Sequence, residues 1–111
     1  MTGPAPARRY KGFTPKAGVY RVTHRPSGRS LLGVSPHAEG MLNRIRFQLD
    51  LGAHPLAALQ RDWTADGAAV FTFELLDVLT PDAAGEVPQA DLDELLALWQ
   101  GQLALTPEQR Y

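Results

Sequence analysis

The stretch GVYRVTHRPSGRSLLG, from Gly18 to Gly33, sets the start of the fold. Two short runs rich in apolar and β-branched residues flank the turn-forming segment Arg25-Pro-Ser-Gly-Arg29. Strand formers on both sides of a Pro, Ser and Gly cluster are typical of a β-hairpin. We therefore predict two antiparallel strands, over residues 19–23 and 30–34, joined by a tight turn.

Two helices are predicted after the hairpin. Leu42, Ile45 and Leu49 recur at helical spacing, and Gly40 favours a start near Met41 rather than at the Ser35-Pro36 pair that could otherwise begin the helix. The second helix follows His54-Pro55, with Leu56, Leu59 and Trp63 on one face, and ends at Asp66-Gly67. Both helices have an apolar face that must pack against another element.

A strand and a last helix complete the predicted order. Phe71, Phe73 and Leu75 alternate with other residues, which predicts a strand over 69–79. Leucines and Trp99 at helical spacing predict a helix over about 90–104, and its first turn is acidic, as the helix dipole favours. The chain is therefore predicted to have an α/β fold of the α+β type, in the order ββααβα.

Length and composition favour a single domain. The chain has 111 residues, of which 44% are hydrophobic, and no cysteine. The lack of cysteine excludes disulfides and thiol chemistry, and no apolar run predicts a membrane span or a signal peptide. We expect a cytoplasmic protein with a flexible basic arm at 1–16, one domain at 17–105 and a C-terminal tail at 106–111.

Charge is divided unevenly along the chain. Residues 1–46 hold nine basic residues against one acidic residue, whereas the remainder holds two basic residues against eleven acidic ones. Such asymmetry is typical of proteins with a polyanion-binding face, although ordinary solvated charge on both halves is the alternative. The histidines, His24, His37 and His54, form no pair at helical spacing, so no zinc site is predicted.

Two triplets in the hairpin resemble those of a known nuclease family. Gly18-Val19-Tyr20 and, about ten residues later, Leu31-Leu32-Gly33 are similar to the paired triplets of the GIY-YIG nuclease domain. Residues 52–79, GAHPLAALQRDWTADGAAVFTFELLDVL, resemble a recurrent segment of the same family. The resemblance covers roughly Ala17 to Leu103 and implies a three-stranded antiparallel sheet flanked by helices.

The catalytic positions that the resemblance implies are mostly apolar here. Family members use two motif tyrosines, an arginine on the first helix and a glutamate on the last helix that holds one divalent metal. Tyr20 keeps the first tyrosine, but the other positions fall on Leu31, Met41 and Leu96. We predict a degenerate site with no metal ligand and no cofactor. Magnesium or manganese would be needed only if the domain were active.

Arg44 is the residue that could restore activity. It follows Met41 by nearly one helical turn, so a shift in the alignment would bring it to the same site. The alternative to a degenerate domain is thus a metal-dependent endonuclease that uses Tyr20 and Arg44. The other explanation for Arg44 is a solvated helix face.

Basic residues on and beside the hairpin are the predicted binding groups. In the family that this chain resembles, the hairpin is where the domain meets its substrate. The predicted partner is nucleic acid, with DNA favoured over RNA. The alternative for these arginines is charge that protects an edge strand from aggregation. A third hypothesis is a protein-interaction or structural domain that uses the acidic last helix. The predicted nucleic-acid-binding residues are Lys16, Arg21, Arg25, Arg29 and Arg46.

Overall fold

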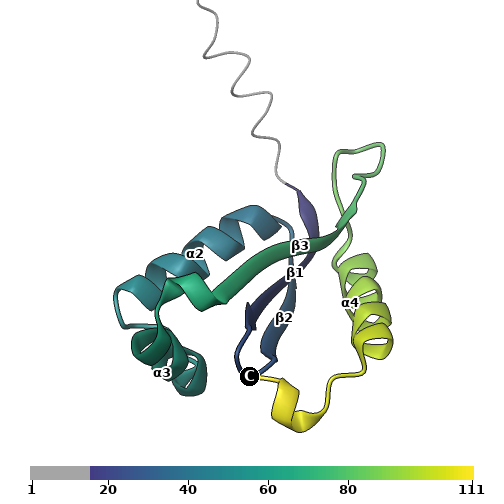
Figure 1. Cartoon of the computed structure of the whole chain (residues 1–111). Helices are drawn as coiled ribbons and strands as arrows, with labels where there is room; N and C mark the ends of the chain where they lie inside the picture. Colours follow the sequence, from purple (N-terminus) through teal and green to yellow (C-terminus); the bar gives the residue numbers. More distant parts are fainter. Residues whose placement is uncertain (1–15) are drawn as a thin grey trace, which may run out of the picture.

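A three-stranded antiparallel sheet with helices on both sides forms the domain (Figure 1). The structure is a computed structural model and describes residues 16–111. The predicted arm therefore lies outside the described residues, apart from Lys16. In chain order the elements are β1 (Ala17–His24), β2 (Arg29–Ser35), α2 (Ala38–Asp50), α3 (Ala57–Asp66), the 3-10 turn η1 (Ala68–Val70), β3 (Phe71–Leu79), α4 (Gln89–Leu103) and the 3-10 turn η2 (Pro107–Gln109). This order confirms the predicted α+β fold.

β1 is the central strand, because the sheet order is β2-β1-β3. Tyr20 of β1 lies opposite Gly33 of β2 and opposite Leu75 of β3. The β1–β3 register shifts between Val19 and Tyr20, which marks a β-bulge. A bulge increases the local twist and re-aims the neighbouring side chains.

One face of the sheet packs against α2 and α3. Tyr20 and Val22 belong to a buried cluster with Ile45 of α2 and Trp63 of α3. The Trp63 ring lies 5.1 Å from the ring of Phe71. Phe71 is buried in this cluster while Phe73 and Leu75 pack against it, so the alternation predicted for the third strand is confirmed.

The other face of the sheet packs against α4, which lies across the sheet from α2 and α3 (Figure 1). Val19 and Leu92 are both completely buried and lie outside the cluster on the first face. Trp99 of α4 donates a hydrogen bond from Nε1 to Asp77 Oδ2 of β3 at 3.2 Å. The apolar residues of the last helix therefore pack against the sheet, as their spacing predicted.

The first helix begins three residues earlier than predicted. The backbone N–H of His37 donates to Ser35 Oγ at 3.0 Å, and that of Ala38 donates to the Lys16 carbonyl at 2.9 Å. The Ala38 side chain is fully buried. These contacts order the first turn in spite of Gly40, because tertiary packing outweighs the modest cost of a glycine in a helix.

The third strand begins two residues later than predicted, because residues 69 and 70 belong to η1. The backbone N–H of Arg25 donates to the Val70 carbonyl at 3.0 Å, and the Arg25 guanidinium donates to the carbonyls of Ala69 and Val70. The hairpin turn therefore holds these carbonyls, and the strand starts only at Phe71.

The sequence predicts a C-terminal tail at residues 106–111. In the structure this segment lies against the outer side of β2. Arg110 forms a parallel bridge with Ser30, and the backbone N–H of Tyr111 donates to the Ser30 carbonyl at 3.1 Å. The Tyr111 side chain packs against the core cluster. Figure 1 shows this segment returning from α4 to the hairpin end of the sheet.

His54 organises the start of α3. The backbone N–H of Leu56 donates to His54 Nδ1 at 3.1 Å, while that of His54 donates to Gln60 Oε1 at 3.0 Å. Gln60 in turn donates from Nε2 to the Leu49 carbonyl at 3.1 Å, which ties α3 to the end of α2. Nδ1 must be unprotonated to accept, and burial lowers the pKa of the His54 imidazole.

We expect this histidine to make stability depend on pH. Since its folded-state pKa lies below its ordinary value near 6.5, the folded protein binds the proton less well than the unfolded chain does. The contribution is complete above about pH 6.5 and is lost as pH falls through the folded-state pKa. Urea unfolding from pH 8 to 5 should show this loss in the wild type.

The matched variant is His54→Asn, whose side-chain oxygen can accept the same hydrogen bond without titrating. The other two histidines remain in both proteins, so only the difference between the two pH profiles reports on His54. Parallel profiles for wild type and variant would contradict the assignment.

Candidate functional site

Tyr20, the motif tyrosine that the sequence retains, is packed inside the first face of the sheet. Only 9% of the residue is exposed. Its ring lies over Gly33, so closely that a Cβ at this glycine would overlap the hydroxyl oxygen and the ring. Burial raises the pKa of the Tyr20 hydroxyl. The phenol therefore stays protonated near neutral pH.

Gly18, the first glycine of the motif, is fixed by the backbone of the neighbouring strand. A Cβ here would overlap the Asp77 carbonyl of β3, beside the bulge. Steric contacts explain why both motif positions are glycine: Gly18 leaves room for the β3 backbone, and Gly33 leaves room for the Tyr20 ring. Packing therefore accounts for both glycines.

Apolar side chains occupy the positions where the resemblance would place polar groups, two of them on the same face of the sheet as Tyr20. Leu31 lies opposite Val22, so it is on the same face of the sheet as Tyr20. Leu31 and Met41 are both partly buried against the core cluster. Leu96 lies on α4, across the sheet. The side chain at each of these positions lacks a titratable group.

Arg44 is exposed on α2. It is the charged residue nearest to Met41 on the flank of the helix that carries Met41. A separation of three residues turns it about 60° from Met41, further toward solvent. The predicted nucleic-acid-binding residue Arg46 lies on the other flank, where its guanidinium is 5.1 Å from the ring of Phe73. The two arginines therefore face opposite edges of the sheet.

The other predicted binding residues are placed at separate locations. Lys16 lies 3.8 Å from Glu39 at the start of β1, whereas Arg25 and Arg29 flank the turn at its far end. A strand of eight residues spans about 26 Å. Lys16 and the hairpin turn are therefore far apart, and residues 16–111 show no single basic patch built from all the predicted residues.

Arg21 lies on the face that packs against α4, away from Tyr20. Its neighbours across the strands are Leu32 and Glu74. Its Nε atom is buried and has no hydrogen-bond partner among the described residues. Arg29 contacts a different element, since its guanidinium lies 5.6 Å from the centre of the Tyr111 ring.

A polar cluster that the sequence did not indicate lies at the hairpin end of the sheet. His24 is only 5% exposed, and its Nε2 lies 2.7 Å from Asp66 Oδ2 while its Nδ1 lies 2.7 Å from Ser27 Oγ. Tyr111 donates its hydroxyl to Asp62 Oδ2 at 2.5 Å. Asp62 also lies 3.8 Å from His24 Nδ1. We refer to these five residues as the hairpin-end cluster.

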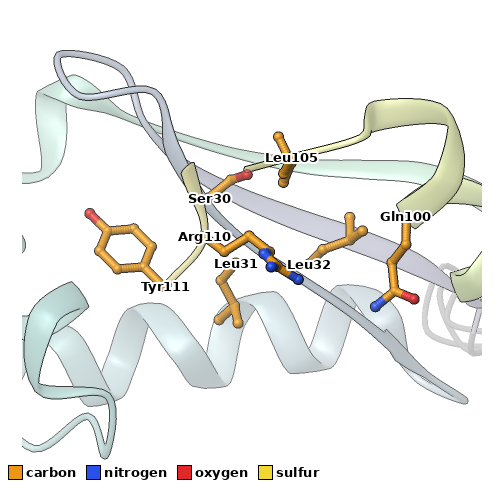
Figure 2. Close-up of a pocket in the computed structure, with 7 residues that line it drawn as sticks. All are labelled: Ser30, Leu31, Leu32, Gln100, Leu105, Arg110 and Tyr111. Atoms are coloured by element: carbon orange, nitrogen blue, oxygen red, sulfur yellow. The ribbon is translucent and has the colours of Figure 1, made fainter. Parts of the chain in front are cut away.

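A small cavity lies beside this cluster, at the outer side of β2 (Figure 2). Its volume is about 220 Å³, and its lining includes Leu32, Gln100 and Arg110. Figure 2 shows the Arg110 and Gln100 side chains extending into the cavity from its two sides, with Leu105 next to Ser30. Ser30 Oγ is buried with no partner among the described residues.

Comparison with known proteins gives a structural match only. No family model and no curated protein matches the sequence. The catalytic domain of homing endonuclease I-TevI superposes with a TM-score of 0.68, at 20% identity, over 86% of this chain and 97% of that one. The fold is that of a GIY-YIG domain.

A mutant catalytic domain of the intron endonuclease I-TevI gives a similar result. Its TM-score is 0.63 at 21% identity, over 80% of this chain and 84% of that one. The predicted GIY-YIG-like fold is therefore confirmed.

A divalent metal, which this fold family implies, does not fit the residues of this GIY-YIG-like domain. Within residues 16–111, no group of three or more histidine, aspartate or glutamate side chains could hold a metal ion. The position of the family glutamate carries Leu96, and the nearby Asp77 accepts from Trp99. Hard divalent cations need oxygen ligands, so we derive no step through a metal.

The helices of this GIY-YIG-like domain are short and amphipathic. None of those in the described part of the chain is long and apolar enough to cross a membrane.

Proposed function

We propose that this GIY-YIG-like domain binds nucleic acid, DNA in preference to RNA, without efficient phosphodiester cleavage. The observation that supports the second half is the packing around the buried Tyr20: Leu31 and Met41, at the positions matched to catalytic groups, are apolar residues that pack against the cluster containing Tyr20. Hydrolysis of an anionic diester needs a base for water and a positive group for the developing charge. The side chains of Leu31 and Met41 can supply neither group.

Binding is supported by the fold and by charge. The structures that superpose on this chain are catalytic domains of an endonuclease, and nucleic acid is the substrate class that such a fold handles. Arg29 and Arg110 lie on and beside β2, which is an outer strand of the sheet, and Arg44 is exposed on α2. Arginines that neutralise phosphates gain affinity through the release of counterions.

The test is an anisotropy titration of labelled duplex and single-stranded DNA, with matched RNA, at several salt concentrations. We expect log affinity to fall with log salt, by about 0.9 for each duplex phosphate that is neutralised. DNA incubated with the protein and magnesium or manganese should remain without nicks. Absence of binding at about 50 mM salt would overturn the proposal.

Two variants separate binding from cleavage. Arg44→Ala should weaken binding and reduce the salt slope by about one phosphate, while Tyr20→Phe should leave binding unchanged. Should nicks appear, and disappear in Tyr20→Phe or Arg44→Ala, the domain would instead be an active nuclease that uses these two residues. That result would retain the binding half of the proposal and remove the other half.

A further inference from the structure

Three side chains of the hairpin-end cluster are connected in series by hydrogen bonds. Ser27 Oγ lies 2.7 Å from His24 Nδ1, and His24 Nε2 lies 2.7 Å from Asp66 Oδ2. The proposed nucleic-acid binding uses none of these side chains. A hydroxyl beside an imidazole, with the imidazole oriented by a third group, is the arrangement of an activated nucleophile.

The partners of the imidazole decide which of its nitrogens is the base. An ionised carboxylate only accepts hydrogen bonds, so Asp66 places the proton of the neutral imidazole on Nε2. Nδ1 of His24 is then the acceptor, and the Ser27 hydroxyl is its donor. The backbone N–H of Arg29 donates to Ser27 Oγ at 3.2 Å, which leaves the hydroxyl proton for the imidazole. Nδ1 is therefore in position to take the proton of the serine.

The nucleophile is open to solvent while the base is not. Ser27 is exposed in the turn between β1 and β2, whereas only 5% of His24 is exposed. A small substrate can therefore reach the hydroxyl, and the imidazole is shielded from water. Asp62 Oδ2 lies 3.8 Å from His24 Nδ1. This second carboxylate would stabilise the imidazolium that forms when the histidine accepts the proton.

The turn that carries the serine is held against the end of α3. Gly28 adopts a φ of 77°, which a glycine tolerates, and its N–H donates to the His24 carbonyl at 2.9 Å. The backbone N–H of Arg25 donates to the Val70 carbonyl at 3.0 Å. Val70 follows Asp66, the last residue of α3, by four positions. The nucleophile, the base and the orienting carboxylate therefore lie on segments that are bonded to each other, as a preorganised site requires.

The turn also offers a donor for a developing negative charge. Within residues 16–111, the backbone hydrogen bonds of the turn are donated by Arg25 and Gly28, which leaves the N–H of Ser27 for a substrate. In hydrolases of the serine, histidine and aspartate type, the N–H of the nucleophilic serine is one of the donors to the oxyanion. A single donor stabilises this charge only in part, so the chemistry is confined to esters with a good leaving group.

We propose that Ser27, His24 and Asp66 form a nucleophilic site that hydrolyses small, activated carboxylic esters. Ser27 Oγ bonds to the ester carbonyl carbon as His24 Nδ1 takes the hydroxyl proton. The bond from that carbon to the leaving oxygen then breaks, the leaving group departs with the proton, and the acyl group stays on the serine. Water attacks the acyl carbon in the second half, again with His24 as the base. The carboxylic acid is released and the proton returns to Oγ. This activity goes beyond the proposed nucleic-acid binding.

The test uses the full chain and p-nitrophenyl acetate near pH 8. We expect a burst of p-nitrophenol in proportion to the protein, followed by slower turnover, because the acetyl group accumulates on the serine before water removes it. Mass spectrometry of peptides from protein quenched during the burst should place the acetyl group on Ser27. Ser27→Ala should lose both the burst and the acetylated peptide.

Variants of the partners test the roles of the imidazole and the carboxylate. His24→Phe keeps a ring in the core and should lose the burst. Asp66→Asn should slow acetylation of Ser27 by about a hundredfold or more, because Asp66 is a positioning residue that selects the tautomer of the base. Asp66→Glu keeps a carboxylate and should recover part of the rate, which a purely structural contact would not explain. Unfolding curves check that each variant is folded.

The matched control is His37→Ala, since His37 is an exposed histidine at the start of α2 and free imidazoles also react with activated esters. This variant should keep the burst of the wild type. Four results would overturn the proposal: equal bursts from the wild type and Ser27→Ala, acetyl groups found only on residues other than Ser27, acetylation by Asp66→Asn as fast as by the wild type, or a burst with no turnover after it.

Discussion

Replacing Gly33 by alanine should destabilise the domain by about 2–3 kcal/mol, the usual cost of forcing an extra group into a packed core. The new Cβ would overlap the hydroxyl oxygen and the ring of Tyr20. The ring is held by the core around it, since Tyr20 is only 9% exposed. Urea unfolding followed by circular dichroism measures the change in the free energy of unfolding.

A double-mutant cycle with Tyr20→Ala tests the cause. Once the ring is gone, the second substitution should cost less than about 0.5 kcal/mol, which gives a coupling of roughly 2 kcal/mol. The control is Gly101→Ala on α4, where a Cβ would meet nothing within 4 Å. That change should stabilise the helix by about 0.5–1 kcal/mol. Equal costs of Gly33→Ala in both backgrounds would show that the glycine is needed for something other than the tyrosine.

This cycle also bears on why the hairpin keeps the form of a nuclease motif while the surrounding positions do not. Gly33 makes room for the Tyr20 ring and Gly18 makes room for the Asp77 carbonyl of β3, so neither glycine can take a side chain without a cost in stability. Leu31 and Met41 fill space against the core and need no partner of a particular kind. Packing therefore maintains the glycines and the tyrosine whether or not the hydroxyl takes part in chemistry.

Much of the fold could be predicted from local patterns, because those patterns arise from local physics. The hairpin turn and the alternation of Phe71, Phe73 and Leu75 depend on residues adjacent in sequence, as does the apolar face of α4. The start of α2 was predicted wrongly, because Ala38 is ordered by the Lys16 carbonyl and by burial. A sequence pattern holds no information on such a contact.

The hairpin-end cluster and the cavity could not be predicted for the same reason. His24 and Asp66 are 42 residues apart, and Asp62 and Tyr111 are 49 residues apart. A single signal was present, since His24 shares the inward face of β1 with Tyr20 and Val22. That position indicates burial and hence a polar partner, without saying which residue provides it.

Loss of His24 is the second large effect that we expect. His24→Ala should destabilise the domain by about 3 kcal/mol, because it removes a buried ring that lies 5.0 Å from Phe71 together with two hydrogen bonds. His24→Phe keeps the ring and should cost about 1 kcal/mol, since Asp66 is exposed enough to regain water. Similar losses for both variants would mean that the hydrogen bonds, not the ring, dominate.

Tyr111, the tyrosine of the hairpin-end cluster, should make the stability of the domain depend on pH. Burial and the hydrogen bond to Asp62 raise the pKa of the Tyr111 hydroxyl well above its ordinary value of 10. The folded state therefore holds this proton more tightly than the unfolded chain, so the stabilisation is complete below about pH 10 and declines above it. Tyr111→Phe should cost about 1 kcal/mol at pH 7 and less at pH 11.

Tyr20 also has a raised pKa and titrates in both proteins, so the difference between the wild type and Tyr111→Phe isolates Tyr111. A constant difference from pH 7 to 11 would contradict the hydrogen bond to Asp62. A declining difference would show that this bond stabilises the contact between α3 and the segment that pairs with Ser30.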